Sequence, residues 1–158
     1  MPFPLSSLNR LALAATLHCL TGCAIGEVLG LVLGTAFGLG TGATMVLAIV
    51  LAFAFGYGLT LLPLVRAGLP LAAALNLALA TDTLSITIME IVDNGIMLVI
   101  PGAMDAGLTD PLFWGSLAVA LLLAGIAAYP VNRWLVGRGK GHARLHGHHG
   151  SGHGPHHA

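Results

Sequence analysis

The chain has 158 residues, of which 56% are apolar and only 8% are charged, and its formal net charge is zero. Ordinary soluble domains carry about 25% charged residues, so this composition excludes that class and indicates a membrane protein. The balanced charge gives no reason to expect a nucleic-acid partner, and the sequence contains no phosphate-cradling glycine motif.

Four apolar segments are each long enough to cross a bilayer, whose hydrocarbon core of about 30 Å needs about 20 helical residues. They cover residues 11–37, 43–65, 69–100 and 111–136. Their apolar positions run continuously and do not alternate as they would in a membrane β-barrel. The sequence therefore predicts an all-α fold, with a bundle of four transmembrane helices in residues 1–136 and a separate tail at 137–158.

The basic residues predict the orientation of this bundle. They are Arg10, Arg66, Arg133, Arg138, Lys140 and Arg144. They precede the first segment, separate the second from the third, or lie in the last turn of the fourth and beyond it. Because Lys and Arg in short loops stay in the cytoplasm, we expect a multi-pass membrane protein with both termini cytoplasmic.

The first segment carries two overlapping signals. The letters LTGC, from Leu20 to Cys23, match the lipobox at which a bacterial lipoprotein is cleaved and lipidated. Cleavage would leave a short apolar remnant instead of the polar tether of a lipoprotein, and would place Glu27 at the edge of the lipid. We therefore expect an uncleaved chain, although the motif alone does not decide whether it is processed.

A stripe of small residues marks one face of the same segment. Its members are Gly22, Gly26, Gly30, Gly34 and Gly38, which recur at every fourth position. In lipid, such a stripe lets two helix backbones approach closely. The stripe predicts close packing against another helix. A homodimer formed through Gly22, Gly26, Gly30 and Gly34 would be one form of such packing.

Cys19, Cys23 and Glu27 are also spaced by four and form a second ridge beside the glycines. Cβ atoms at i and i+4 lie about 5 to 6 Å apart, which is too far for a disulfide. Two thiolates at this spacing suit a soft metal ion, whereas buried free cysteine is also a common packing residue. Glu27 favours a functional interpretation, because a carboxylate inside a membrane is costly.

The third segment contains the most polar stretch of any span, TDTLSITIMEIVDNGIM at residues 81–97. One helical face carries Asp82, Met89, Asp93 and Met97, and Glu90 lies at its edge. This face is expected to meet the cysteine ridge in the bundle core. It predicts an ion-binding path, while a polar seam that only specifies helix pairing and a proton relay are the alternatives.

The tail at 137–158 is rich in glycine and contains seven of the eight histidines. They are His142, His146, His148, His149, His153, His156 and His157. Such a segment has no core to bury, so we expect it to be disordered. Neutral imidazoles bind transition metals, which predicts weak metal buffering in the cytoplasm, with a merely solvated tail as the alternative.

The chain resembles a bacterial membrane family catalogued as domain of unknown function 4396. The likeness extends from about Ala14 to His142 and rests on LHCLTGCAIGE, TDTLSITIMEIVDN, IPGAMDAGLTDPLFWGSL and YPVNRWL. It implies a small multi-span membrane protein and a loose association with copper proteins. It implies no particular activity, substrate or catalytic residue.

These patterns predict a membrane protein that binds and transports or handles a transition metal, with copper favoured and zinc or iron as alternatives. The predicted ligands are Cys19, Cys23, Glu27, Asp82, Met89, Glu90 and Asp93. No catalytic triad or nucleotide motif is present, so no enzymatic activity is expected. The alternative function is that of a structural or assembly subunit, or a proton-relay component, in a larger membrane complex.

Overall fold

A computed structural model describes residues 6–147 of the chain, with side chains described for residues 6–139. The elements are α1 (Ser7–Ala36), α2 (Thr41–Arg66), α3 (Leu71–Val99), the 3₁₀ turn η1 (Ala103–Asp105) and α4 (Pro111–Gly147). The described residues contain no strand, and four of the helices are long and apolar enough to span a membrane. The predicted all-α, four-span architecture is confirmed.

Local signals in the sequence explain where the helices end. After α1 and after α2, the chain turns through a glycine with a positive φ, at Gly38 (65°) and Gly68 (93°), a conformation that side-chain-bearing residues rarely adopt. Helix α4 begins with Pro111, and the Asp110 carboxylate accepts a hydrogen bond from the Leu112 backbone N–H at 2.9 Å. The short turns after α1 and α2 therefore reverse the chain direction, whereas a longer loop that contains η1 joins α3 to α4.

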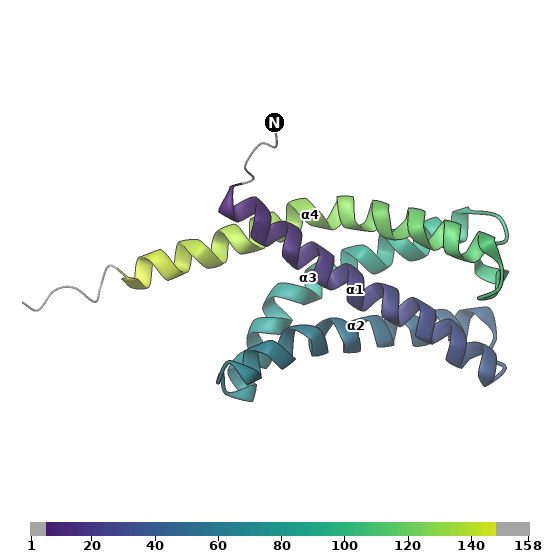
Figure 1. The fold of residues 1–158 in the computed structure, drawn as a ribbon, viewed down its shortest axis with the longest axis horizontal. Coiled ribbons are helices and arrows are strands. Elements are labelled where there is room, and N and C mark those ends of the chain that lie inside the picture. The colour runs from purple at the N-terminus through teal and green to yellow at the C-terminus, as the bar shows by residue number, and fades with distance from the viewer. Residues whose placement is uncertain (1–5, 148–158) are drawn as a thin grey trace, which may run out of the picture.

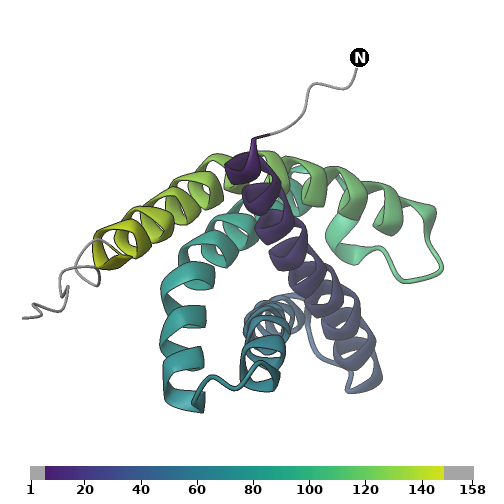
Figure 2. The same ribbon diagram turned by 60° about the vertical axis from the view of Figure 1, so that its left-hand side comes forward.

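The helices form a bundle in which α1 crosses diagonally from α4 to α2 (Figures 1 and 2). Helix α3 packs against α4 and α2, and α1 meets α3 across the middle. The start of α1, the α2–α3 turn and the late part of α4 lie at one end of the bundle, which we call the terminal end (Figure 1). The α1–α2 turn and the loop at residues 100–110 lie at the other, which we call the loop end.

The glycine stripe of α1 packs against α2 of the same chain. Gly22 lies against Gly56, Gly26 against Ala52, Gly30 against Ala48, and Gly34 against Thr44. A Cβ atom added at Gly22 would come within 2.8 Å of the Gly56 Cα atom. The prediction of close helix packing is therefore right, but its partner was wrong: α2 fills the face that a homodimer through Gly22, Gly26, Gly30 and Gly34 would use.

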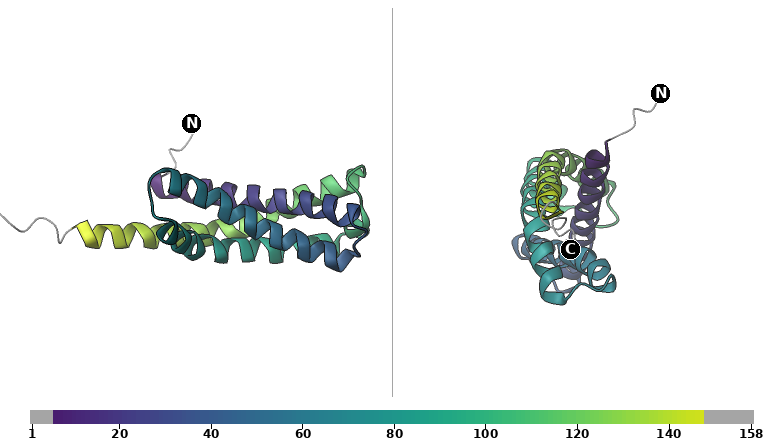
Figure 3. Two further views of the ribbon diagram at one scale, coloured as in Figure 1. Left: turned by 90° about the horizontal axis from the view of Figure 1, so that it is seen from below. Right: turned by 90° about the vertical axis from the view of Figure 1, so that its left-hand side faces the viewer.

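Helix α4 is longer than predicted and corrects the expected tail boundary. It continues through Gly147 and projects beyond the other helices (Figure 3), so residues 137–147 are helical instead of disordered. Extending a formed helix adds one hydrogen bond for each residue fixed, whereas starting a new one is costly. The interspersed Arg, Lys, Ala and Leu residues therefore carry the helix past its glycines. Residues 148–158 lie outside the described residues.

Two tryptophans mark the length of α4 that fits a bilayer. Trp114 and Trp134 are both about half exposed, and their spacing corresponds to about 30 Å of helix. The Trp114 indole donates a hydrogen bond to the Leu108 carbonyl at 2.8 Å, and the Arg138 guanidinium lies 4.0 Å from the centre of the Trp134 ring. Tryptophans of this kind gather at the two membrane interfaces, and exposed apolar side chains cover the helices between them, as contact with lipid requires.

Candidate functional site

The polar side chains of α1 and α3 meet in the centre of the bundle. Helix α1 contributes Cys19 and Cys23, which are 2% and 0% exposed. Helix α3 contributes Asp82, Glu90 and Asp93, which are 7%, 5% and 0% exposed. The polar faces of the two helices meet because α1 contacts α3 in the middle of the bundle. We call these residues, with Glu27 and Ser85, the polar ladder.

The part of the ladder nearer the loop end holds three carboxyl groups from two helices. Glu27, Glu90 and Asp93 are close enough to interact electrostatically, and the Cys23 thiol lies beside Glu90. The Asn94 amide donates a hydrogen bond to Glu90 Oε2 at 3.2 Å. Glu27 Oε1, Glu90 Oε1 and both oxygens of Asp93 are buried without a hydrogen-bond partner.

The part nearer the terminal end is built around a thiol and one carboxyl group. Cys19 lies next to Ser85 and close to Asp82. The Thr81 hydroxyl donates a hydrogen bond to Asp82 Oδ1 at 3.0 Å, whereas Asp82 Oδ2 and the Ser85 hydroxyl have no partner. Potential ligands therefore continue from the three-carboxyl cluster toward the terminal end.

No basic side chain compensates the buried acids among the described residues. Within residues 6–139, whose side chains are described, the arginines are Arg10, Arg66, Arg133 and Arg138, all of which are exposed. Each of them belongs to the terminal end of the bundle. Unpaired carboxylates in a membrane interior are expensive, so the ladder must be neutralised by protons or by a bound cation.

The structure brings all seven predicted metal-ligand residues into the bundle interior. Met89 is 0% exposed and packs in one core cluster with Cys19 and Cys23. Within the described residues, however, no three His, Cys, Asp or Glu side chains are already arranged to hold one metal ion. The donors are spread along α1 and α3 and do not form a single closed cage.

The histidines are placed apart from the ladder or beyond the side chains described. His18 faces α2, where its Nε2 atom lies 3.0 Å from the Thr60 hydroxyl oxygen. His142 and His146 belong to α4, within the stretch whose side chains are not described. The remaining predicted tail ligands lie outside the described residues; they are His148, His149, His153, His156 and His157.

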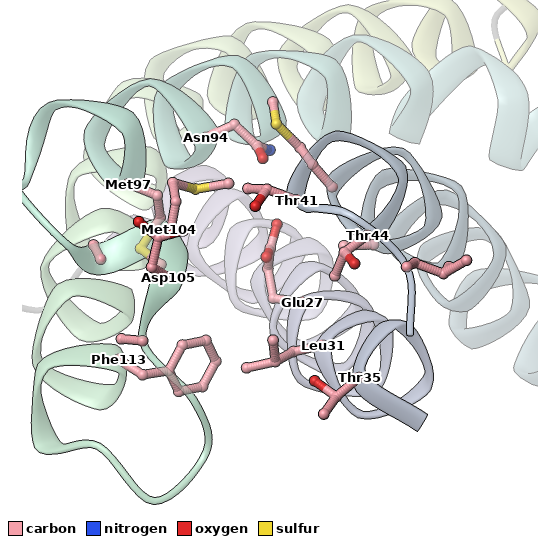
Figure 4. A pocket seen from close by; sticks show the side chains of 15 residues that line it. Glu27, Leu31, Thr35, Thr41, Thr44, Asn94, Met97, Met104, Asp105 and Phe113 are labelled. Carbon is pink, nitrogen blue, oxygen red and sulfur yellow. The ribbon is translucent and has the colours of Figure 1, made fainter. Parts of the chain in front are cut away.

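A cavity of about 220 Å³ adjoins the ladder at the loop end of the bundle. Residues from α1, α2, α3, η1 and α4 line it; Glu27 belongs to both the cavity and the ladder, and Asn94 lines the cavity and donates a hydrogen bond to Glu90 of the ladder. In Figure 4 the Glu27 carboxylate points between Met97, Met104 and Asp105 on one side and Thr44 on the other. Glu27 therefore connects this space to the buried acids.

Sequence patterns missed the contribution of α2 to this cavity. Met45 and Thr44 line it, yet no polar period marks the span in which they lie. The position of α2 against the glycine stripe brings both residues to the cavity.

Residues 9–141 match the family described as domain of unknown function (DUF4396), and the chain belongs to that family. No curated protein and no solved structure matches the chain.

Proposed function

We propose that this chain is a membrane protein that binds a transition-metal ion and conducts it along the polar ladder, with copper favoured over zinc or iron. The observation that carries the proposal is the cluster of Glu27, Glu90 and Asp93, in which four buried oxygens have no hydrogen-bond partner and no described arginine lies nearby. A cation among them would satisfy the unpaired oxygens and neutralise their charge together.

The order of the ligands supports conduction more than storage. An ion that enters the cavity would meet Glu27 first, then Asp93 and Glu90, and then Cys23. Cys19 and Asp82 continue the path toward the terminal end. Conduction requires several sites of moderate strength, because an ion held in one closed cage leaves slowly.

The ligand types support a transition metal. Carboxylates alone would suit Mg²⁺ or Ca²⁺, but Cys19 and Cys23 add two soft sulfur donors. Thiolates favour Cu(I) and Zn²⁺, and mixed sulfur and oxygen donors leave iron as a further candidate. Imidazoles of the histidine-rich tail would bind the same ions weakly after their release.

The location proposed for this activity is the inner membrane of a bacterium, with both termini in the cytoplasm. The four described arginines at the terminal end support this orientation under the positive-inside rule. The cavity would then face the outside of the cell, and the tail would receive ions on the inside.

A proton relay is the second candidate function, and one specific contact favours it. Glu27 and Asp93 come from different helices and interact electrostatically. Two such groups can share one proton, and chains of intramembrane acids carry protons in pumps. This candidate uses the same carboxyl groups but does not require Cys19 or Cys23.

Metal content of the purified protein tests the metal proposal against the relay. The starting variant is the full-length chain with its seven tail histidines replaced by asparagine, which removes tail binding and leaves α4 whole. We expect near-stoichiometric copper or zinc in this variant and loss of that metal when Cys19→Ser and Cys23→Ser are added. Metal-free protein after growth in copper, zinc and iron would reject the proposal and leave the relay.

A further inference from the structure

The sulfur-containing side chains of the described residues are concentrated along a single path. The chain has two cysteines and five methionines, of which Met1 alone lies outside the described residues. Met89 packs in one core cluster with Cys19 and Cys23 of the ladder. The other three methionines, Met45, Met97 and Met104, all line the cavity. No described sulfur atom belongs to a side chain elsewhere in the bundle.

The three cavity methionines come from three separate elements. Met45 lies on α2, Met97 on α3 and Met104 on η1, so their convergence is a product of the tertiary fold. Figure 4 shows Met97 and Met104 beside Asp105, across the cavity from Thr44. Thioethers and a carboxylate therefore line one space together.

Packing accounts for only part of this arrangement: Met97 belongs to an apolar core cluster with Phe113, against which Met104 packs. Methionine commonly fills gaps in apolar cores because its side chain is flexible. Here the three side chains surround an open volume of about 220 Å³ that also holds the Glu27 carboxylate, the Asn94 amide and the Thr44 hydroxyl. The same methionines also line an open space that they share with side chains carrying oxygen donors, which a purely apolar core would not provide.

We propose that the cavity is a loading site for Cu(I), in which Met45, Met97 and Met104 bind the ion and Glu27 passes it to the ladder. This inference rests on the proposed function and adds the oxidation state of the ion and the end of the bundle from which it is loaded. Thioethers are soft, neutral ligands that select Cu(I) over Zn²⁺ and Mg²⁺. Glu27 and Asp105 supply the negative charge that a monovalent cation needs.

The loading site is tested by Cu(I) binding to the full-length protein in detergent, measured by competition with a chromogenic Cu(I) chelator. All variants carry asparagine at the seven tail histidines. The triple variant Met45→Leu, Met97→Leu and Met104→Leu removes the thioethers at nearly constant volume, which cores tolerate well. The pair Cys19→Ser and Cys23→Ser is the matched control, because it removes the ladder thiols and leaves the cavity methionines.

We expect the triple variant to lose one Cu(I) site, with affinity at that site falling at least about tenfold, since even indirect changes around a metal cost about 10- to 100-fold. The cysteine pair should retain this site, and Zn²⁺ binding should be equal in the triple variant and its parent. If the triple variant does not fold, Met104→Leu alone must still weaken the site.

A direct readout uses selenomethionine protein carrying Cys19→Ser, Cys23→Ser and Met89→Leu, loaded with Cu(I). Its X-ray absorption spectrum should show copper bound to selenium from the cavity. Three results would overturn the loading site while leaving ladder binding intact. They are unchanged Cu(I) affinity in the methionine variant, equal loss of Cu(I) and Zn²⁺ binding in that variant, and copper without selenium neighbours. Absence of Cu(I) binding in every variant would overturn both the loading site and copper as the conducted metal.

Discussion

Gly26 of α1 lies so close to Ala52 of α2 that a Cβ atom at position 26 would collide with the Ala52 backbone. Gly26→Ala should therefore lower the free energy of unfolding by about 1 to 3 kcal/mol, the usual cost of overpacking. Gly58→Ala is the matched control, because a Cβ atom at Gly58 meets nothing within 4 Å. The control should be neutral or stabilising by about 0.4 to 1 kcal/mol. Thermal unfolding in detergent checks both, and equal effects would contradict the assignment of this contact.

Asp82 should matter for metal uptake, because it is buried and one of its oxygens has no partner. Asp82→Asn keeps the shape of the side chain but removes its charge, so we expect cellular metal accumulation to fall toward the level of cells lacking the protein. Asp110→Asn is the control, since Asp110 is exposed at the start of α4 and asparagine caps helices equally well. Asp105 is a poorer control because it lines the cavity.

A purely structural role for Asp82 predicts the opposite result. A neutral amide is easier to bury than a carboxylate, so Asp82→Asn would then raise the melting temperature without changing accumulation. Both quantities are measured on the same variant. A more stable protein with unchanged metal uptake would reject the conducting role of this residue.

Glu27 and Asp93 should behave as one unit in the metal-free protein. Each of Glu27→Gln and Asp93→Asn removes a charge that the other carboxylate opposes, so each should raise stability in the presence of a chelator. The double variant should gain less than the sum, with a coupling energy of about 0.5 to 3 kcal/mol, as contacting residues show. Denaturant unfolding of the four proteins measures this cycle, and strict additivity would show that the two carboxyl groups do not interact.

A buried hydrogen bond joins α1 to α4 near the terminal end, where the Asn132 amide donates to the Thr16 hydroxyl at 2.9 Å. Asn132→Ala should cost about 0.6 to 1.7 kcal/mol of stability, which are the average and the maximum found for hydrogen bonds between membrane helices. Ser116→Ala is the comparison, because the buried Ser116 hydroxyl bonds only carbonyls of its own helix. A loss at Ser116 as large as that at Asn132 would argue against a link between helices.

The chain should remain uncleaved at the lipobox-like letters before Cys23. Cys23 is fully buried, and cleavage there would remove the part of α1 that carries Cys19 and the bond from Thr16 to α4. Intact-mass measurement on isolated membranes should find the full chain, apart from trimming of Met1. A product that begins at a lipid-modified Cys23 would overturn both the four-span topology and the ladder.

The sequence by itself determined the features that depend on composition and local period. Apolar length set the four spans, and spacing by four placed Cys19, Cys23 and Glu27 on one ridge of α1. The period of α3 likewise put Asp82 and Asp93 on one face. These features are local because a regular helix fixes the direction of every side chain from its position alone.

Only the tertiary structure decided which faces meet. The spacing of the glycine stripe predicts that another helix backbone approaches Gly26. It does not predict whether that backbone belongs to α2 or to a second copy of the chain. The convergence of Met45 with Met97 and Met104 likewise depends on how α2, α3 and η1 are placed around one space. Helix periodicity specifies the direction of a side chain around its own helix. The size and lining of a cavity depend instead on the distances between helices, which are set by side-chain packing and by the turns that join the helices.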